Sequence, residues 1–172
     1  MKAPGPPLFR PRQRLAVVLT VFTVVLLEVA FSARGQEPSI PSAQSVILAR
    51  KALMNAVEEN SDRISRMISD REFNLPEVRA RARNIFVMLR AFPHMFPPNS
   101  NQWKEGADLD PVTDTVASPE IWTNFDDFYR LALAAAERAD EMGRATTEDE
   151  VKSLHRALGN VCDFCHALYY RE

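Results

Sequence analysis

Apolar side chains recur at steps of three and four residues along most of the chain beyond position 43, and this period predicts amphipathic helices. The first helix is expected over residues 43–69, where Ile47, Met54 and Ile64 fall on one stripe. A neighbouring row that includes Met67 widens this face. The helix therefore has one apolar side to bury.

A second helix should start near Leu75, with Asn74 as its cap and a proline at its first helical position, and Pro93 should stop it. The next stretch, residues 93–118, is loop-like because proline and glycine recur in it. A loop of this length normally has a role in function or packing. We expect its aromatic residues to pin it to the helices.

A third helix opens at residues 118–120, where serine caps and proline takes the first turn; it should break near Asn124 and end before Gly143. The fourth helix begins at Thr147, because Glu150 three residues later completes a capping box. No convincing strand pattern occurs. Four amphipathic helices predict an all-α fold, an antiparallel four-helix bundle.

The start of the chain has the layout of an export signal, with basic residues, an apolar run over 15–27 and small residues before Gln36. The apolar run is too short to cross a bilayer ~30 Å thick as a helix. We therefore divide the chain into a signal peptide at 1–35, a polar lead-in at 36–42 and the bundle at 43–172. Export places the mature protein in the periplasm, with no stable membrane insertion after cleavage, whereas a retained leader would anchor it.

Charge narrows the choice of partner. Beyond residue 35, acidic side chains outnumber basic ones. This balance argues against a nucleic-acid partner and favours a basic or neutral protein.

Candidate chemistry is concentrated in five consecutive residues, Cys162-Asp163-Phe164-Cys165-His166. Two cysteines three apart, with histidine directly after the second, form the attachment site of a c-type haem. Positions i, i+3 and i+4 of a helix share one face, so both thiols and the imidazole reach one porphyrin. Each thiol would add across one haem vinyl group, and His166 would ligate the iron. The motif predicts one covalently attached haem c as the cofactor.

Other uses of the two cysteines are weighed against haem attachment. They could form a thiol redox pair or a structural disulfide in a haem-free bundle, although the strand–helix context of redox motifs is absent. A zinc site would need two more ligands, and no second cysteine pair or suitably spaced histidine pair supplies them.

A haem motif on the last of four helices resembles the class II cytochromes c, which comprise cytochrome c prime and its low-spin relatives. The resemblance covers residues 43–172, and three further patterns occur in the family's order. They are Arg50-Lys51-Ala52-Leu53-Met54, Phe92-Pro93-His94-Met95-Phe96-Pro97 and Pro119-Glu120-Ile121-Trp122. The resemblance implies a haem held between helices, with His166 as its proximal ligand.

The resemblance also implies roles for two residues of the first helix. The residue four after the helix arginine faces the open side of the iron, and here it is Met54. In the low-spin branch a methionine there ligates the iron and makes an electron carrier. In the five-coordinate branch the open pocket binds nitric oxide or carbon monoxide. Arg50 is a candidate contact for a haem propionate, with an ordinary surface salt bridge as the alternative.

Three other side chains compete as iron ligands. His94 and Met95 could approach a haem edge from the long loop, although the resemblance assigns them to packing. His155 lies on the same helix as His166, about 16 Å away at 1.5 Å per residue, so one iron cannot take both. We expect His155 to be exposed or to lie on the propionate side.

Together these observations predict an exported one-electron carrier with thioether bonds from Cys162 and Cys165 and axial ligands His166 and Met54. It would dock with redox partner proteins and catalyse no reaction itself. The first alternative is a five-coordinate cytochrome c prime that binds nitric oxide or carbon monoxide. The second is the haem-free thiol-redox or structural bundle. Homodimers are common in the family, but no exposed-face pattern establishes one here.

Overall fold

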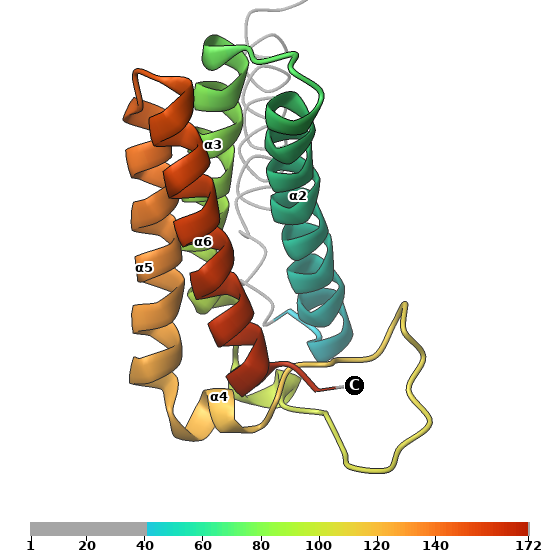
Figure 1. The fold of residues 1–172 in the computed structure, drawn as a ribbon. Coiled ribbons are helices and arrows are strands. Elements are labelled where there is room, and N and C mark those ends of the chain that lie inside the picture. Colours follow the sequence, from blue (N-terminus) through green and yellow to red (C-terminus); the bar gives the residue numbers. More distant parts are fainter. Residues whose placement is uncertain (1–40, 172) are drawn as a thin grey trace, which may run out of the picture. The chain divides into compact units, whose positions relative to one another are not determined.

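The computed structural model describes residues 41–171. The bundle consists of four long helices, α2 (Ala43–Ser69), α3 (Leu75–Ala91), α5 (Phe125–Arg144) and α6 (Glu148–Tyr169), and successive ones run in opposite directions (Figure 1). The predicted all-α four-helix bundle is confirmed. The predicted signal peptide lies outside the described residues. Within them, no helix is long and apolar enough to cross a membrane.

The helices do not pack on one another equally. The closest packing is between α3 and α5, followed by α5 with α6 and α2 with α3, whereas α2 and α6 touch at few points. We call the line along which α2 and α6 face each other the α2–α6 seam. The main core lies between the closely packed helices, and its most buried members are Ile64, Met67, Val78, Ala82, Ile85, Ala136, Ala139, Met142 and Val151.

Two helix starts follow from local hydrogen bonds. The Asn74 side chain accepts from the backbone N–H of Glu77 at the start of α3. At the start of α6, Thr147 and Glu150 form the complete predicted capping box. These caps satisfy N–H groups that have no partner within the helix. Both predicted helix starts are confirmed.

The third predicted helix is divided and ends later than expected. A break at Asn124 separates the short α4 (Glu120–Thr123) from α5, as predicted. However, α5 continues through Gly143, which is buried. A Cβ atom added to Gly143 would meet Arg83 Cγ at 3.4 Å and the Arg79 carbonyl oxygen at 3.8 Å. These are ordinary contact distances. Gly143 lies inside the helix where α5 packs on α3 and does not end it.

The long loop contains two 3₁₀ turns, η1 (Phe92–Met95) and η2 (Pro98–Ser100). Its aromatic residues pack on the end of the bundle, as expected. The centre of the Phe96 ring lies 4.7 Å from that of Phe128. The centre of the Phe128 ring lies 5.4 Å from that of Tyr169, at the end of α6. We call this second group of buried side chains the aromatic cluster; it comprises Phe96, Ile121, Phe128 and Tyr169.

Candidate haem-binding site

The haem motif lies in the last two turns of α6, where the sequence placed it. Cys162 is half-buried against the main core, and Cys165 is half-buried against the aromatic cluster. His166 is exposed, with its ring 5.7 Å from that of Tyr170. The two thiols thus lie where the two cores meet, and the exposed imidazole, which makes no hydrogen bond within residues 41–171, is accessible to coordinate a metal ion.

Burial suppresses ionisation of both thiols. It raises the pKa of Cys162, and the Asp163 carboxylate adds to the rise. It also raises the pKa of Cys165 to about 11, with a further contribution from Cys162. Both thiols are therefore protonated at neutral pH. A thiol redox pair requires the opposite, a lowered pKa, so this environment does not suit the haem-free redox alternative.

A polar contact between α2 and α6 shows which residues of the two helices lie opposite each other. The Nε2 atom of His155 on α6 lies 3.1 Å from Ser61 Oγ and 3.2 Å from the Ser61 carbonyl oxygen on α2. Met54 is seven residues back from Ser61 along α2, and Cys162 is seven residues on from His155 along α6. Because the helices are antiparallel, both steps run about 10.5 Å in the same direction.

Met54 and Cys162 consequently lie at one level of the α2–α6 seam. Seven residues also return each side chain to nearly the same face of its helix. Met54 is half-buried and packs on the same core as Cys162. Met54 therefore lies on the side of α2 that faces α6, as a sixth iron ligand would need to.

The seam also has room beside the motif. Gly159 lies on α6 between His155 and Cys162, one turn from each, and so shares their face. A Cβ atom added there would meet no other heavy atom within 4 Å. The open space lies one turn from Cys162 on the face of α6 that carries the motif, and this position fits a covalently attached haem.

Arg50 is buried, with only 4% of its surface exposed. Its guanidinium donates to Ser100 Oγ at 2.9 Å and to Thr115 Oγ1 at 3.1 Å, and its central carbon lies 4.4 Å from the centre of the Phe96 ring. Burial lowers the pKa of Arg50 to about 10. No ion pair of Arg50 occurs within residues 41–171, so the surface salt bridge weighed as its alternative role is not formed.

A buried cation held only by neutral oxygens and ring faces carries a desolvation cost that a counter-anion would offset. A haem propionate is a carboxylate and would form a strong, charge-assisted hydrogen bond with a guanidinium. Arg50 lies one turn from Met54 along α2 and so shares its face. The surroundings of Arg50 therefore fit the propionate end of a haem.

The far end of the seam is bridged by residues 113–118 of the long loop, which we call the strap. On the α2 side, Lys51 Nζ donates to the Asp114 carbonyl oxygen at 2.5 Å. On the α6 side, the backbone N–H of Arg171 donates to the Val116 carbonyl oxygen at 2.8 Å. The strap thus joins α2 to the end of α6 near Arg50. Local sequence patterns gave no sign of this connection.

Of the competing ligands, His94 lies apart from this arrangement, and its exposed ring packs edge-on against Tyr129, 5.8 Å away. Met95, in contrast, packs on the same aromatic cluster as Cys165, and its carbonyl oxygen accepts from Arg50 Nη1 at 3.4 Å. We expected His155 to be exposed or to lie on the propionate side. It is instead half-buried against α2, at a level about 16 Å from Arg50 along that helix. The clue in the sequence was Ser61, a polar residue on the apolar stripe of its helix.

Two open surface hollows lie away from the motif. One, of about 440 Å³, is lined by residues at the end of α5 and the start of α6, among them Glu141, Arg144 and Leu154. The other, of about 460 Å³, is lined by residues 122–127 and Arg130. Neither is lined by the cysteines, His166, Met54 or Arg50, so neither competes with the seam as the haem site.

Comparison with known proteins shows the family of the chain. A family model described as Cytochrome C' matches residues 45–170. A cytochrome c-556 of Agrobacterium tumefaciens (strain II Chrys) is 31% identical over 99 residues, which are 56% of this chain and 72% of that protein. The crystal structure of cytochrome c' from Thermochromatium tepidum is 22% identical, with a TM-score of 0.68 over 78% of this chain and 100% of that one.

A further cytochrome c', which shows ligand-controlled dimer dissociation, is 21% identical with a TM-score of 0.67, again over 78% of this chain and 100% of that one. A helical bundle with a Cys-x-x-Cys-His motif on its last helix defines a class II c-type cytochrome. The chain belongs to the cytochrome c' family, and its cofactor is covalently attached haem c. Such a protein transfers electrons or binds small gases.

Proposed function

We propose that the protein is a periplasmic one-electron carrier in which His166 and Met54 are the axial ligands of the haem iron. The observation that supports this choice is the level of Met54 in the α2–α6 seam. Its thioether packs on the same core as Cys162 and, by the Ser61–His155 contact, lies opposite it. Met54 would therefore supply a ligand to the iron from α2, and His166 would supply one from α6.

Each residue then has a defined task. Cys162 and Cys165 hold the haem by two thioether bonds, and His166 donates its imidazole. The haem, when attached, supplies a one-electron ferric–ferrous couple. Met54 donates a neutral, soft thioether, which favours the ferrous state and raises the reduction potential relative to two imidazoles. With both axial positions filled by the chain, no position is open to a substrate, so the protein catalyses no reaction of its own.

Arg50 supplies the counter-charge to a haem propionate in this proposal. Its buried guanidinium already has neutral partners on two sides, Ser100 and Thr115, which hold it in place. A redox partner protein would dock beside the motif, where Phe164 is 57% and Leu168 is 41% exposed. Homodimer formation is a separate, second proposal, supported by the dimer that is named for one of the similar structures.

The test compares two methionine variants of the mature protein made in cells that attach haem. Met54→Ala should convert the ferrous protein to a high-spin form that binds carbon monoxide at once, because it removes the sixth ligand. Met88→Ala is the matched control, since Met88 is a half-buried methionine on α3 that packs on the same core. It should stay low-spin.

The same samples distinguish the alternatives. A parent protein that binds carbon monoxide at once would be a five-coordinate, gas-binding member of the family. A site opened by Met95→Ala and not by Met54→Ala would assign the sixth ligand to Met95. Haem that remains with the protein after acid–acetone extraction is covalently attached, and its loss would contradict the roles of Cys162 and Cys165.

A further inference from the structure

We propose that His155 is a positioning residue for the sixth iron ligand. Its hydrogen bond to Ser61 fixes the spacing of α2 from α6 and thereby the reach of Met54 toward the iron. The inference rests on the proposed function, because it concerns how Met54 is held. It assigns a role in the haem site to a histidine that cannot itself reach the iron.

The hydrogen bond has a defined direction. A carbonyl oxygen only accepts hydrogen bonds, so we assign the ring proton of His155 to Nε2, which faces the Ser61 carbonyl oxygen at 3.2 Å. The same N–H also faces Ser61 Oγ, which accepts as a second partner. His155 therefore donates from α6 to the backbone and side chain of one residue of α2. A backbone acceptor cannot turn away, so the contact fixes the position of the helix itself.

No other hydrogen bond or ion pair joins α2 directly to α6 within residues 41–171. The two helices also share few packing contacts, since α2 rests mainly on α3 and α6 on α5. At the propionate end of the seam, the strap joins them only indirectly. Toward the other end, the His155–Ser61 contact is the direct polar link between α2 and α6 within residues 41–171.

The levels connect this contact to the iron ligands. Ser61 is two turns from Met54 on α2, and His155 is two turns from Cys162 on α6. Gly159, between His155 and Cys162, leaves open space, so no side chain at that position limits how closely α2 and α6 approach each other. A change in helix spacing at His155 would therefore be passed along two stiff helices to Met54. Ligand geometry has to be held to within about 0.5 Å, so a small change would weaken the thioether bond.

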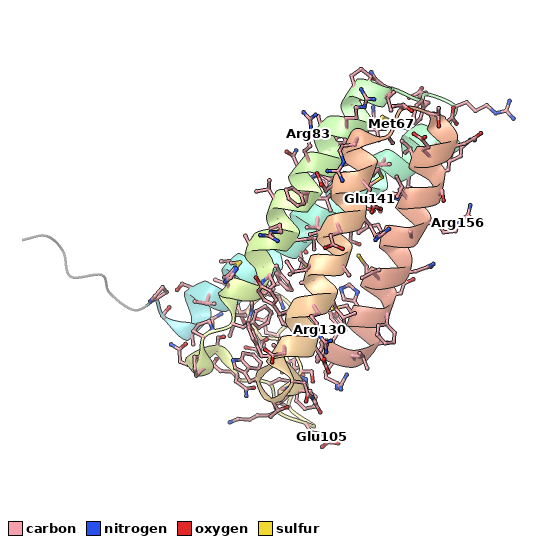
Figure 2. All side chains as sticks on the ribbon, turned by 90° about the vertical axis from the view of Figure 1, so that its left-hand side faces the viewer. Met67, Arg83, Glu105, Arg130, Glu141 and Arg156 are labelled. Carbon is pink, nitrogen blue, oxygen red and sulfur yellow. The ribbon has the colours of Figure 1, made fainter. Side chains whose placement is uncertain are left out.

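The test uses the haem-bearing protein and three variants near this contact. His155→Leu removes the donor and keeps a side chain of similar bulk. His155→Gln keeps an amide N–H that can donate to the same carbonyl. Arg156→Leu is the matched control, since Arg156 is exposed on the same helix and points away from the bundle (Figure 2).

Carbon monoxide binds only the fraction of ferrous molecules whose iron is free of the thioether. His155→Leu should therefore speed its binding roughly fivefold, the factor that corresponds to one hydrogen bond of average strength. The reduction potential should fall in the same variant, because the thioether raises it. His155→Gln should restore both values to those of the parent, and Arg156→Leu should leave the binding rate unchanged.

A general loss of stability is tested by Val78→Ala, which trims a fully buried side chain of α3 away from the seam. It should lower the melting temperature without changing carbon monoxide binding. If it speeds binding as much as His155→Leu does, the positioning role is wrong. If His155→Leu binds at the parental rate, the role is also wrong, while ligation by Met54 stands. A parent protein that binds carbon monoxide at once contradicts Met54 ligation and the positioning role with it.

Discussion

Burial gives the residues of the haem site properties that they lack in water. The Arg50 cation is 4% exposed and has neutral partners, and the Cys165 thiol has a pKa of about 11. In the chain alone, burial of the Arg50 cation carries a desolvation cost, and the protonated Cys165 thiol is unreactive. Each becomes useful beside a haem, where a propionate neutralises the cation and the thiol is consumed in a thioether bond.

The charge of Arg50 should affect the reduction potential. In general, a positive unit charge on the order of 10 Å from a redox centre, at an effective dielectric constant of ~20, contributes roughly 1–2 kcal/mol in favour of the reduced state. Arg50→Gln should therefore lower the potential by tens of millivolts, as measured by equilibrium redox titration. Arg66→Gln, a change at an exposed arginine of the same helix, should have a much smaller effect. Equal shifts in the two variants would show that Arg50 acts only through net charge.

The thiol of Cys165 should react slowly in the folded, haem-free chain. A pKa of about 11 in place of the ordinary 9.0 leaves about a hundredfold less thiolate at neutral pH, and the thiolate is the reactive form. Alkylation of Cys165, followed by mass spectrometry, should reach half its limiting rate near pH 11. A midpoint at or below pH 9 would contradict the burial of this thiol.

The same raised pKa has a consequence for stability. The folded chain holds the proton of Cys165 more tightly than the unfolded chain does. Its contribution to the free energy of unfolding is therefore fully present below about pH 9 and is lost as the pH rises to about 11. Urea denaturation of the haem-free chain between these values should show the decline.

At the scale of helices, the most predictable features are those made by neighbouring residues. Asn74 and the Thr147–Glu150 pair satisfy helix ends through hydrogen bonds over three positions, so the sequence alone predicts the starts of α3 and α6. The predicted stop at Gly143 is wrong, because glycine commonly ends helices but can also lie within one where another helix packs against it. Only the nearness of α3 tells the two uses apart.

Gly143 also provides a stability test. A Cβ atom there would make ordinary contact with the flexible Arg83 side chain, while alanine is the better helix former. Gly143→Ala should raise the free energy of unfolding by about 0.5–1 kcal/mol, as measured by urea denaturation. Gly106→Ala should have the opposite effect, because Gly106 has a φ of 72°. A loss of stability in Gly143→Ala would mean that α5 and α3 tolerate no added atom.

Contacts between distant elements were beyond the reach of local patterns. The burial of Arg50 depends on the fold of the long loop, which brings Ser100 and Thr115 to α2. The role of His155 depends on which helix lies opposite α6. Helical periods show which face of a helix is apolar, but they do not set the level at which two helices meet. The haem motif itself was predictable, because its spacing is local.

In the described bundle, the helices that pack most closely are not the pair that carries the candidate haem site. The main core joins α3 to α5 and their neighbours, whereas α2 and α6 meet along a sparsely packed seam (Figure 1). The His155–Ser61 contact and the strap join the two helices at different levels, with Met54 and Cys162 between them. Such a frame can accept a flat group without disturbing the core.

The most direct test of the axial-ligand assignment is the visible spectrum of the ferrous, haem-bearing protein before and after carbon monoxide is added. With His166 and Met54 both bound to the iron, we expect sharp, split α and β bands that carbon monoxide leaves unchanged. A broad high-spin spectrum that shifts at once on addition of the gas would show that Met54 does not hold the iron, and would contradict the electron-carrier assignment.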